Sequence, residues 1–292
     1  HDKKIGLALS GGGYRAAAYH IGTLKALHKM GILDKIDVIS SVSGGSITAA
    51  YYALHKDNFK KFEETYKVKL KKGVLNTSWP LLVLYVIIIV SIVIGTPFFL
   101  VCCSMASYSK LLAVFGVWTI MLITLLDGQF IILPTSRLIQ RQYDKLFFQG
   151  KTLTDLPEKP VLTINATEVT SNRIFSFSQT KVSGGEFKET LFKKDEIPVA
   201  FAVMASSAFP GGISPIKFPT KYMTEERDDA HKPYLIDGGI YDNIGCHKFT
   251  EGKSSFKVTY SIVSLAENDK PVYKSYSNSF TLLRRVIDLA LN

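Results

Sequence analysis

Apolar runs that enter glycine-rich turns and then helix-like segments organise the first part of the chain. Residues 5–9 (Ile-Gly-Leu-Ala-Leu) predict a short buried strand, followed by Ser-Gly-Gly-Gly-Tyr-Arg and a helix over 16–30. Residues 36–39 predict a second strand, followed by a serine- and glycine-rich turn and a helix over 47–54. Two consecutive strand–helix units of this kind favour a parallel sheet with helices on both faces.

The same pattern resumes in the second half of the chain. Strands are predicted over 160–167, 173–179, 234–237 and 256–265, with a helix over 197–207 and a last helix from about residue 279. The polar residues 220–233 predict a surface loop. We therefore predict an α/β fold with three layers, α/β/α, and a mostly parallel central sheet.

Two long apolar blocks interrupt this pattern. Residues 79–103 contain no charged residue, and residues 111–133 contain only Asp127. Each block approaches or exceeds the roughly 20 residues that span the core of a bilayer. Trp79 and Tyr108 suit the membrane interfaces. We predict an inserted transmembrane helical hairpin, and a pair of buried core helices is the alternative.

The insertion divides the chain into three parts. Residues 1–72 form the first part of the α/β domain, 73–142 the inserted hairpin, and 143–292 the second part of the domain. Residue 292 falls inside a helix-like run. We therefore expect the second part to be truncated at its C-terminus.

The distribution of charge predicts an orientation. The formal net charge is +10, with many lysines at 56–72, just before the first block. Arg137 and Arg141 follow the second block, and only Lys110 lies between the two. By the positive-inside rule, both ends of the hairpin face the cytoplasm. We predict an integral membrane protein with its α/β domain on the cytoplasmic side. The sequence lacks an aromatic-plus-basic signature, so no nucleic-acid partner is expected.

Three predicted strands end in polar, glycine-rich turns, and open parallel sheets place their sites at such ends. These turns are Gly11-Gly12-Gly13, Ser43-Gly44-Gly45 and Asp237-Gly238-Gly239. Ser43 lies between a strand and a helix, as in a nucleophile elbow, although Ser41 occupies the position of the usual first glycine. The first turn offers free backbone N–H groups that suit a phosphate or an oxyanion, but it lacks the Gly-Lys-Ser/Thr ending of a P-loop.

Four motifs in this order resemble the patatin-like phospholipase family, in its bacterial type. They are Gly-Gly-Gly-x-Arg at 11–15, Ser-x-Gly at 43–45, Ala-Ser-Ser-Ala-Phe-Pro at 205–210 and Asp-Gly-Gly at 237–239. The resemblance implies a Ser–Asp dyad that hydrolyses acyl esters of phospholipids or lysophospholipids on a three-layer α/β fold. It makes Ser43 the nucleophile and Asp237 the base. It assigns the oxyanion hole to Gly11, Gly12 and Gly13, braced by Arg15, and the support of the turns to Gly45, Gly238 and Gly239.

Histidines and cysteines play no part in this scheme. A dyad needs no histidine, so His20 and His28 are interpreted as packing or surface residues, and His247 as a less favoured third catalytic member. Asp242 and Asn243 are interpreted as fixing the turn after Asp237. Adjacent Cys102 and Cys103, with Cys246 elsewhere, predict no disulfide framework and favour a reducing compartment. We expect neither a metal nor another cofactor.

The leading hypothesis is a membrane-anchored serine acyl hydrolase that acts on lipids of its own bilayer. A lipid acyltransferase would use the same dyad, with an alcohol or a lipid in place of water. A non-catalytic membrane scaffold that retains the fold is a further alternative, which the intact Ser43, Asp237 and glycine loop disfavour. We expect a regulatory partner or the missing C-terminal region to restrain such an enzyme, and a homo-oligomer is a further expectation.

Overall fold

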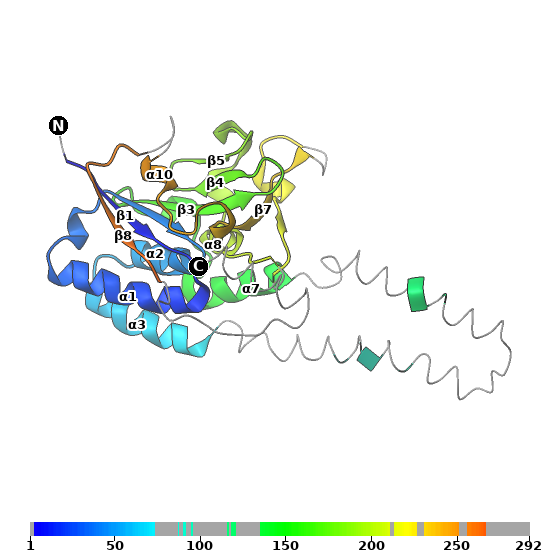
Figure 1. Cartoon of the computed structure of the whole chain (residues 1–292), viewed down its shortest axis with the longest axis horizontal. Helices are drawn as coiled ribbons and strands as arrows, with labels where there is room; N and C mark the ends of the chain where they lie inside the picture. The colour runs from blue at the N-terminus through cyan, green and yellow to red at the C-terminus, as the bar shows by residue number, and fades with distance from the viewer. Residues whose placement is uncertain are drawn as a thin grey trace, which may run out of the picture.

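The computed structural model describes residues 3–73, 135–210, 213–226, 231–250 and 256–266, together with a few positions between 87 and 120. Within these ranges the chain forms an eight-stranded sheet covered by helices (Figure 1). The main path of the sheet has the order β5-β4-β3-β2-β1-β8, and β7 pairs with both β3 and β6. The strands are β1 (Ile5–Leu9), β2 (Val38–Val42), β3 (Val161–Glu168), β4 (Arg173–Phe177), β5 (Val182–Gly184), β6 (Ile216–Lys217), β7 (Tyr234–Asp237) and β8 (Tyr260–Ser264).

The sheet has a parallel part and an antiparallel part. Strands β8, β1, β2 and β3 are parallel neighbours. Strands β4 to β7 are added in antiparallel pairings. The predicted α/β fold with a parallel centre is confirmed, but the pattern did not predict β5 and β6. These strands have only 3 and 2 residues, too few to show an alternation of apolar and polar positions.

Helices cover both faces of the sheet. They are α1 (Gly13–Lys29), α2 (Gly44–Leu54), α3 (Phe59–Lys72), α7 (Thr135–Tyr143), α8 (Val199–Ser206), α9 (Gly239–Asp242) and α10 (His247–Thr250). Helix α2 contacts α1, α3 and α8, so these four helices belong to one side. Figure 1 shows α1 and α3 along that side and α10 on the other. A Cβ on Gly6 of β1 would stand 2.9 Å from the Phe249 ring of α10, so α10 packs against the second face.

Alternation along the strands separates the two faces. One face of β2, β3 and β4 is apolar and packs on α2 and α8 through Ile39, Leu162, Ile164, Ala166, Phe175 and Phe177. The opposite face carries Ser40, Thr163, Asn165, Thr167 and Ser176. Helix α8 is buried along its whole length and α2 along nearly all of it, which explains why both are apolar or small on every side.

Most of the lysine-rich segment 56–72 forms the helix α3. Asn58 caps it by accepting the Lys61 N–H at 3.0 Å, and Gly73, with φ 63°, ends it. The prediction of a surface loop over 220–233 is wrong for the first residues of this range. Tyr222 and Met223 are buried there, because a short 3₁₀ turn directs them into the core.

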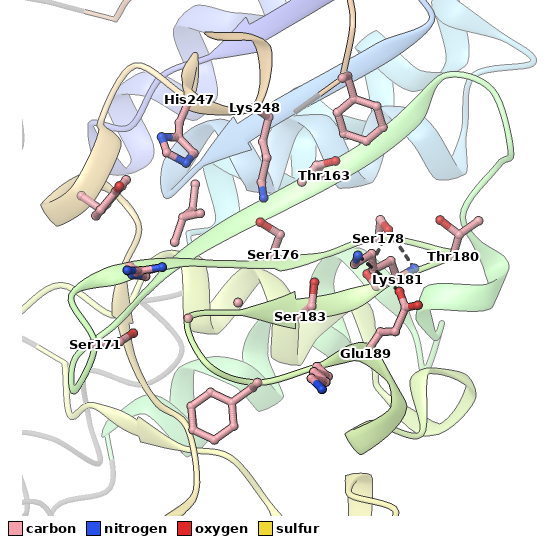
Figure 2. Close-up of a pocket in the computed structure, with 18 of the residues that line it drawn as sticks. Thr163, Ser171, Ser176, Ser178, Thr180, Lys181, Ser183, Glu189, His247 and Lys248 are labelled. Carbon is pink, nitrogen blue, oxygen red and sulfur yellow. Dashed lines mark hydrogen bonds and ion pairs between the residues drawn. The ribbon is translucent and has the colours of Figure 1, made fainter. Parts of the chain in front are cut away.

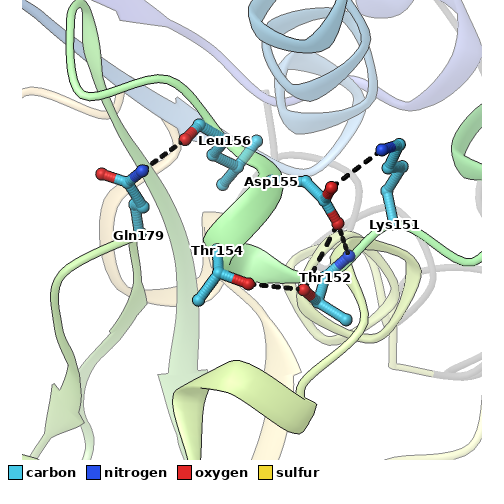
Figure 3. A network of polar contacts seen from close by, with 6 residues as sticks. All are labelled: Lys151, Thr152, Thr154, Asp155, Leu156 and Gln179. Carbon is cyan, nitrogen blue, oxygen red and sulfur yellow. Dashed lines mark hydrogen bonds and ion pairs between the residues drawn. The ribbon is translucent and has the colours of Figure 1, made fainter.

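A polar network away from the glycine turns fixes the connection that leads into β3 (Figure 3). The Asp155 carboxylate accepts the Thr152 N–H at 2.8 Å and lies 2.8 Å from the Lys151 ammonium. Gln179 Nε2 donates to the Leu156 carbonyl at 2.6 Å. Asp155 is therefore an aspartate whose role is confined to this surface connection.

Several predictions fall on residues outside the described ranges. They are the hairpin helices at 79–103 and 111–133, apart from a few positions, Cys102 and Cys103, and the last helix. Among the helices within the described ranges, none has the length and apolar character needed to cross a bilayer. The hairpin and the division of the chain at 72 and 142 stay predictions.

Candidate active site

Ser43 occupies a strained turn between β2 and α2. Its φ of 48° and ψ of −120° lie on the positive-φ side, which residues with a Cβ rarely adopt. Its N–H donates to Ser206 Oγ at 2.9 Å. Ser206 Oγ in turn donates to the Asn165 carbonyl at 2.6 Å and lies 2.9 Å from Ser46 Oγ. The turn is therefore held by side chains of α2 and α8 and by a backbone carbonyl of β3, as expected for a nucleophile elbow.

The elbow packs tightly against the first glycine loop. A Cβ on Gly44 would lie 1.9 Å from the Gly13 carbonyl oxygen, and one on Gly45 would lie 2.5 Å from the Leu9 carbonyl oxygen. A side chain at either position would push the two turns apart. The predicted support role of Gly45 thus has a steric basis, and Gly44 shares it.

Ser41 replaces the usual first glycine of the elbow without a gap or a clash. Its side chain is fully buried, donates to the Thr163 carbonyl at 3.2 Å and accepts from Ser46 Oγ at 3.2 Å. Ser41 thus joins the same hydrogen-bonded network as Ser206. The departure from the usual motif adds a contact to the elbow.

Ser43 and Asp237 are hydrogen-bonded to each other. Ser43 Oγ donates to Asp237 Oδ2 at 2.7 Å, and the Gly239 N–H donates to Asp237 Oδ1 at 2.8 Å. Both side chains are buried, with 6% and 3% of their surfaces exposed. Burial raises the pKa of Asp237 to about 6, against the opposing effect of the Gly239 and Ser43 hydrogen bonds. The carboxylate is therefore a stronger base than an exposed aspartate and is still ionised at neutral pH.

The strand that carries Asp237 is fixed by the predicted Ala-Ser-Ser-Ala-Phe-Pro segment. The Asp237 N–H donates to the Ala208 carbonyl at 3.0 Å, and the Gly238 N–H donates to the Ser206 carbonyl at 3.1 Å. A Cβ on Gly238 would lie 2.3 Å from the Asn165 carbonyl oxygen, so this glycine allows close packing of β7 on β3. Ser206 therefore positions both Ser43 and Asp237.

Only two of the three N–H groups predicted to form the oxyanion hole are available in the first glycine loop. The Gly11 N–H donates to the Asn243 carbonyl at 2.9 Å, so it is occupied and unable to serve a ligand in this arrangement. The N–H groups of Gly12 and Gly13 open α1 and have no acceptor among the described residues. Gly12 has φ 123°, which requires glycine. The Arg15 guanidinium comes within 3.6 Å of where a Gly12 Cβ would stand, consistent with a bracing role.

The remaining polar residues near the site have supporting roles. Asp242 accepts the N–H groups of Ile244, Gly245 and His247 at 3.1, 3.0 and 2.7 Å, so it fixes the turn after Asp237 as predicted. Neither donor to Asp237 is a histidine. The His247 ring lies against Tyr241, with ring centroids 5.1 Å apart. The hydrogen bonds to the Asp237 carboxylate thus come from the Ser43 hydroxyl and the Gly239 N–H.

Sequence reasoning missed three residues of this network. His20, interpreted as a packing or surface residue, has Nε2 2.9 Å from the Ser10 carbonyl oxygen and Nδ1 2.9 Å from Ser264 Oγ, and so ties the glycine loop to β8. Asn165 links Ser40, Ser41 and Ser176. Ser206 was noted only as part of a motif. A signal existed for two of them: His20 lies on the same face of α1 as Leu24 and Leu27, and Asn165 is polar within a buried strand.

The model of the patatin-like phospholipase family matches residues 7–250. The chain belongs to this family. The match contains all four motifs, so the expected class, a lipid acyl hydrolase among the carboxylic ester hydrolases, is confirmed at the level of the family.

Individual relatives are partial or distant. A segment of 55 residues is 46% identical to lysophospholipase NTE1 of Pyricularia oryzae and covers 19% of this chain and 4% of that protein. VipD from Legionella pneumophila has a TM-score of 0.42 at 15% identity, over 89% of this chain and 49% of its own. Human GIVD cytosolic phospholipase A2 has a TM-score of 0.47 at 14% identity, over 80% and 39%. The chain thus spans less than half the length of each of these proteins.

In the described ranges, no group of three or more His, Cys, Asp or Glu side chains is arranged to hold a metal ion. Cys246 is a half-buried free thiol. The serine side chains around Ser43 are hydrogen-bonded to one another or to a backbone carbonyl.

Proposed function

We propose that this chain hydrolyses acyl esters of membrane phospholipids or lysophospholipids through a Ser43–Asp237 dyad and an acyl-enzyme. The observation that carries the proposal is the 2.7 Å hydrogen bond from a strained, buried serine to a buried aspartate of raised pKa. Carboxylates of this kind accept protons from nucleophiles near neutral pH.

In the first step, Ser43 Oγ attacks the ester carbonyl carbon while its proton passes to Asp237 Oδ2. The negative charge that develops on the carbonyl oxygen is stabilised by the N–H groups of Gly12 and Gly13. A donor of this type typically contributes on the order of 3 kcal/mol to the stabilisation of the transition state. Collapse of the intermediate breaks the ester bond, and Asp237 gives its proton to the leaving alcohol.

In the second step, water replaces the alcohol. Asp237 accepts a proton from the water as it attacks the acyl group on Ser43. Release of the fatty acid returns the proton to Ser43 Oγ and restores the dyad. Ser206 acts as a positioning residue throughout, because its hydroxyl holds the Ser43 N–H and its carbonyl holds the strand of Asp237.

We further propose that the enzyme acts on lipids of the bilayer that holds it, from the cytoplasmic side. The apolar blocks 79–103 and 111–133 are predicted to supply the anchor. Helix α3 supports this arrangement, since its last turn carries Lys69, Lys71 and Lys72 directly before the segment that leads to the first block. Lysines in this position favour the anionic cytoplasmic surface of a membrane.

The experiment is a measurement of fatty acid release from phospholipid and lysophospholipid vesicles in the presence of EDTA. Wild type is compared with Ser43→Ala and Asp237→Asn. We expect each substitution to reduce kcat by about a thousandfold or more, because the two groups act as a unit. The matched control is Asp155→Asn, which alters an aspartate of the surface connection and should leave kcat unchanged.

Full activity in Ser43→Ala would disprove the assignment of the nucleophile. Activity that survives in Asp237→Asn but not in Ser43→Ala would require another base. Adding a lysophospholipid or an alcohol as acyl acceptor separates hydrolase from transferase, because a transferase would form a new ester at the expense of free fatty acid.

A further inference from the structure

A cavity lies on the polar face of the sheet, away from the face that packs on α2 and α8. It has a volume of about 960 Å³ and is bounded by β3, β4 and β5 and by the segment that contains α9 and α10 (Figure 2). Thr163 and Ser176 line its floor. In β3, Ala166 is the partner of Asp237 and points to the apolar face, whereas Thr163 points to the opposite one. The cavity is therefore separate from the Ser43–Asp237 site.

Cations dominate the charged lining of this cavity. Four lysine or arginine side chains line it, against one carboxylate, that of Glu189; the four are Arg173, Lys181, Lys188 and Lys248. Glu189 pairs with Lys181 at 3.4 Å, at the exposed rim. The one acidic group is thus used by one lysine, and the lining keeps a net positive charge.

The Lys248 ammonium group is directed into this cavity. In Figure 2 its ammonium group points to the floor of the cavity, toward Ser176 and Thr163. Within the described ranges, no carboxylate pairs with it. Burial, together with repulsion from Lys181, lowers the pKa of Lys248 to about 8. The Lys248 ammonium therefore faces the cavity without a carboxylate partner, which is unfavourable unless a ligand provides an anion.

The floor of the cavity also contains an unsatisfied hydroxyl. Thr163 has 3% of its surface exposed, and its Oγ1 has no hydrogen-bond partner among the described residues. Buried hydroxyls are nearly always hydrogen-bonded, so such an atom calls for a partner. Ser176, by contrast, donates to Asn165 Oδ1 at 2.9 Å. Thr163 and Lys248 are thus two donors that line the same cavity, and within the described ranges no hydrogen-bond acceptor joins them.

We propose that this cavity binds a phosphate group, held by Lys248 and Lys181 with the Thr163 hydroxyl as a further donor. A phosphate accepts several hydrogen bonds from ammonium and hydroxyl groups at the same time. The volume of the cavity admits a phosphate together with a small alcohol such as glycerol. The same chemistry is offered by a lipid headgroup and by a soluble phosphate ester. The site is a binding site distinct from the ester-cleaving centre.

The test uses the full chain with Ser43→Ala, so that hydrolysis plays no part in the result and failure of the proposed function would not affect it. Isothermal titration calorimetry at constant ionic strength measures the affinity for sn-glycerol 3-phosphate. A second arm measures the affinity for detergent micelles that contain phosphatidic acid, with phosphatidylcholine micelles as the reference. Lys248→Gln is expected to weaken binding about tenfold or more, the effect of losing one charge-assisted hydrogen bond.

The matched control is Lys29→Gln, an exposed lysine at the end of α1, which should bind as tightly as the parent. Binding of the soluble ester that weakens in Lys248→Gln supports a soluble ligand. Binding of phosphatidic acid micelles alone, with the same dependence on Lys248, supports a lipid headgroup. Absence of saturable binding in both arms, or equal binding by Lys248→Gln and Lys29→Gln, overturns the proposal. If Lys248→Gln unfolds, the exposed Lys181→Gln decides in its place by the same criterion.

Discussion

The two faces of the same sheet treat polar groups in opposite ways. Near Ser43, on the side of α2 and α8, serine hydroxyls are paired with each other or with a carbonyl. On the opposite face, Thr163 Oγ1 and the Lys248 ammonium have no hydrogen-bond or carboxylate partner in the described part of the chain. A satisfied buried network specifies one geometry, whereas an unsatisfied one indicates a missing ligand. The difference therefore separates the proposed reaction site from the proposed binding site.

The backbone geometry of the Ser43 site is preorganised by its surroundings. The positive φ of Ser43 is unfavourable by itself, by about 1–3 kcal/mol, and persists only because the surroundings determine it. Those surroundings are Ser206, Ser46 and the close approach of Gly44 to Gly13. Each of these contacts can be removed by a separate substitution, and the expected losses of stability and activity differ in size.

The largest effect is expected where the two turns meet. Gly44→Ala places a methyl group 1.9 Å from the Gly13 carbonyl oxygen, which is backbone and unable to move aside. We expect the free energy of unfolding to fall by about 3 kcal/mol or more, with loss of activity. Gly22→Ala is the control, because Gly22 lies in the interior of α1 with no atom within 4 Å of the added Cβ.

Chemical denaturation measures both variants. Gly22→Ala should raise the free energy of unfolding by about 1 kcal/mol, the difference in helix propensity. If Gly44→Ala were as stable as wild type, the elbow would be adaptable, and its contrast with the binding face would disappear.

The second prediction concerns the pH dependence of Asp237. With a pKa of about 6, the carboxylate loses its ability to accept the Ser43 proton below that pH. We expect kcat to fall about tenfold for each unit of pH below about 6, as for a single essential base. A pH–rate profile checks this, and a rate that stays constant well below pH 6 would exclude Asp237 as the base.

The same shift has a consequence for stability, with a definite sign. The pKa of Asp237 is raised on folding, from 3.8 to about 6, so its contribution to stability is present below 3.8 and is lost as the pH rises through 6. Asp237→Asn should therefore be more stable than wild type at neutral pH, by up to about 3 kcal/mol.

Asp155 is the opposite case, because its hydrogen bond to Lys151 lowers its pKa. Asp155→Asn should be slightly less stable at neutral pH, as unfolding curves of both variants would show.

The third prediction tests the serine network. Ser206→Ala removes the acceptor of the Ser43 N–H and leaves that buried donor unsatisfied. We expect a loss of about 1–3 kcal/mol in stability and a decrease of kcat with little change of KM, because the serine loses its position. The adjacent Ser207→Ala is the control, since Ser207 Oγ donates at 2.7 Å to Val203 of its own helix. Equal kcat values in the two variants would contradict a positioning role for Ser206.

The sequence predicted the strands, turns and helices that form the site better than the strand pairings and hydrogen bonds between them. Ser43, Asp237 and the glycine loop carry local signals, namely a strand, small residues and a helix start, and these depend on neighbours in the chain. The antiparallel strands β5 and β6 carry no such signal, because with 3 and 2 residues they are too short to show an alternation of apolar and polar positions. Gly11 was misjudged for a different reason. Its N–H is occupied by Asn243, more than two hundred residues further along the chain, and no local pattern reports that contact.

The supporting network and the cavity on the polar face were beyond sequence reasoning for a similar reason. Ser206 and Asn165 come together only when α8 packs on β3. Lys248 has the sequence context of an ordinary surface lysine, and only the position of the α10 segment beside the sheet makes it half-buried. Charge and motif therefore predicted the chemistry of Ser43, whereas tertiary packing decides which cations and hydroxyls lack partners.

The smallest predicted effect concerns His20, whose pairing makes it a further test of the satisfied face. Because the Ser10 carbonyl only accepts, Nε2 must carry a proton, and a neutral ring accepts the Ser264 hydroxyl proton at Nδ1. Burial lowers the pKa of His20, so its contribution to stability is present above 6.5 and is lost as the pH falls below that value. His20→Gln should therefore be less stable than wild type at about pH 7.5, and the difference should shrink toward pH 5. Unfolding curves at both pH values test this. His55→Gln is the control, because the His55 ring lies at the C-terminal end of α2, where its Nδ1 is 2.8 Å from the Tyr51 carbonyl oxygen. A difference between wild type and His20→Gln that stays constant over this range would mean that the ring tolerates protonation, and the glycine loop would then be held less rigidly than the elbow it contacts.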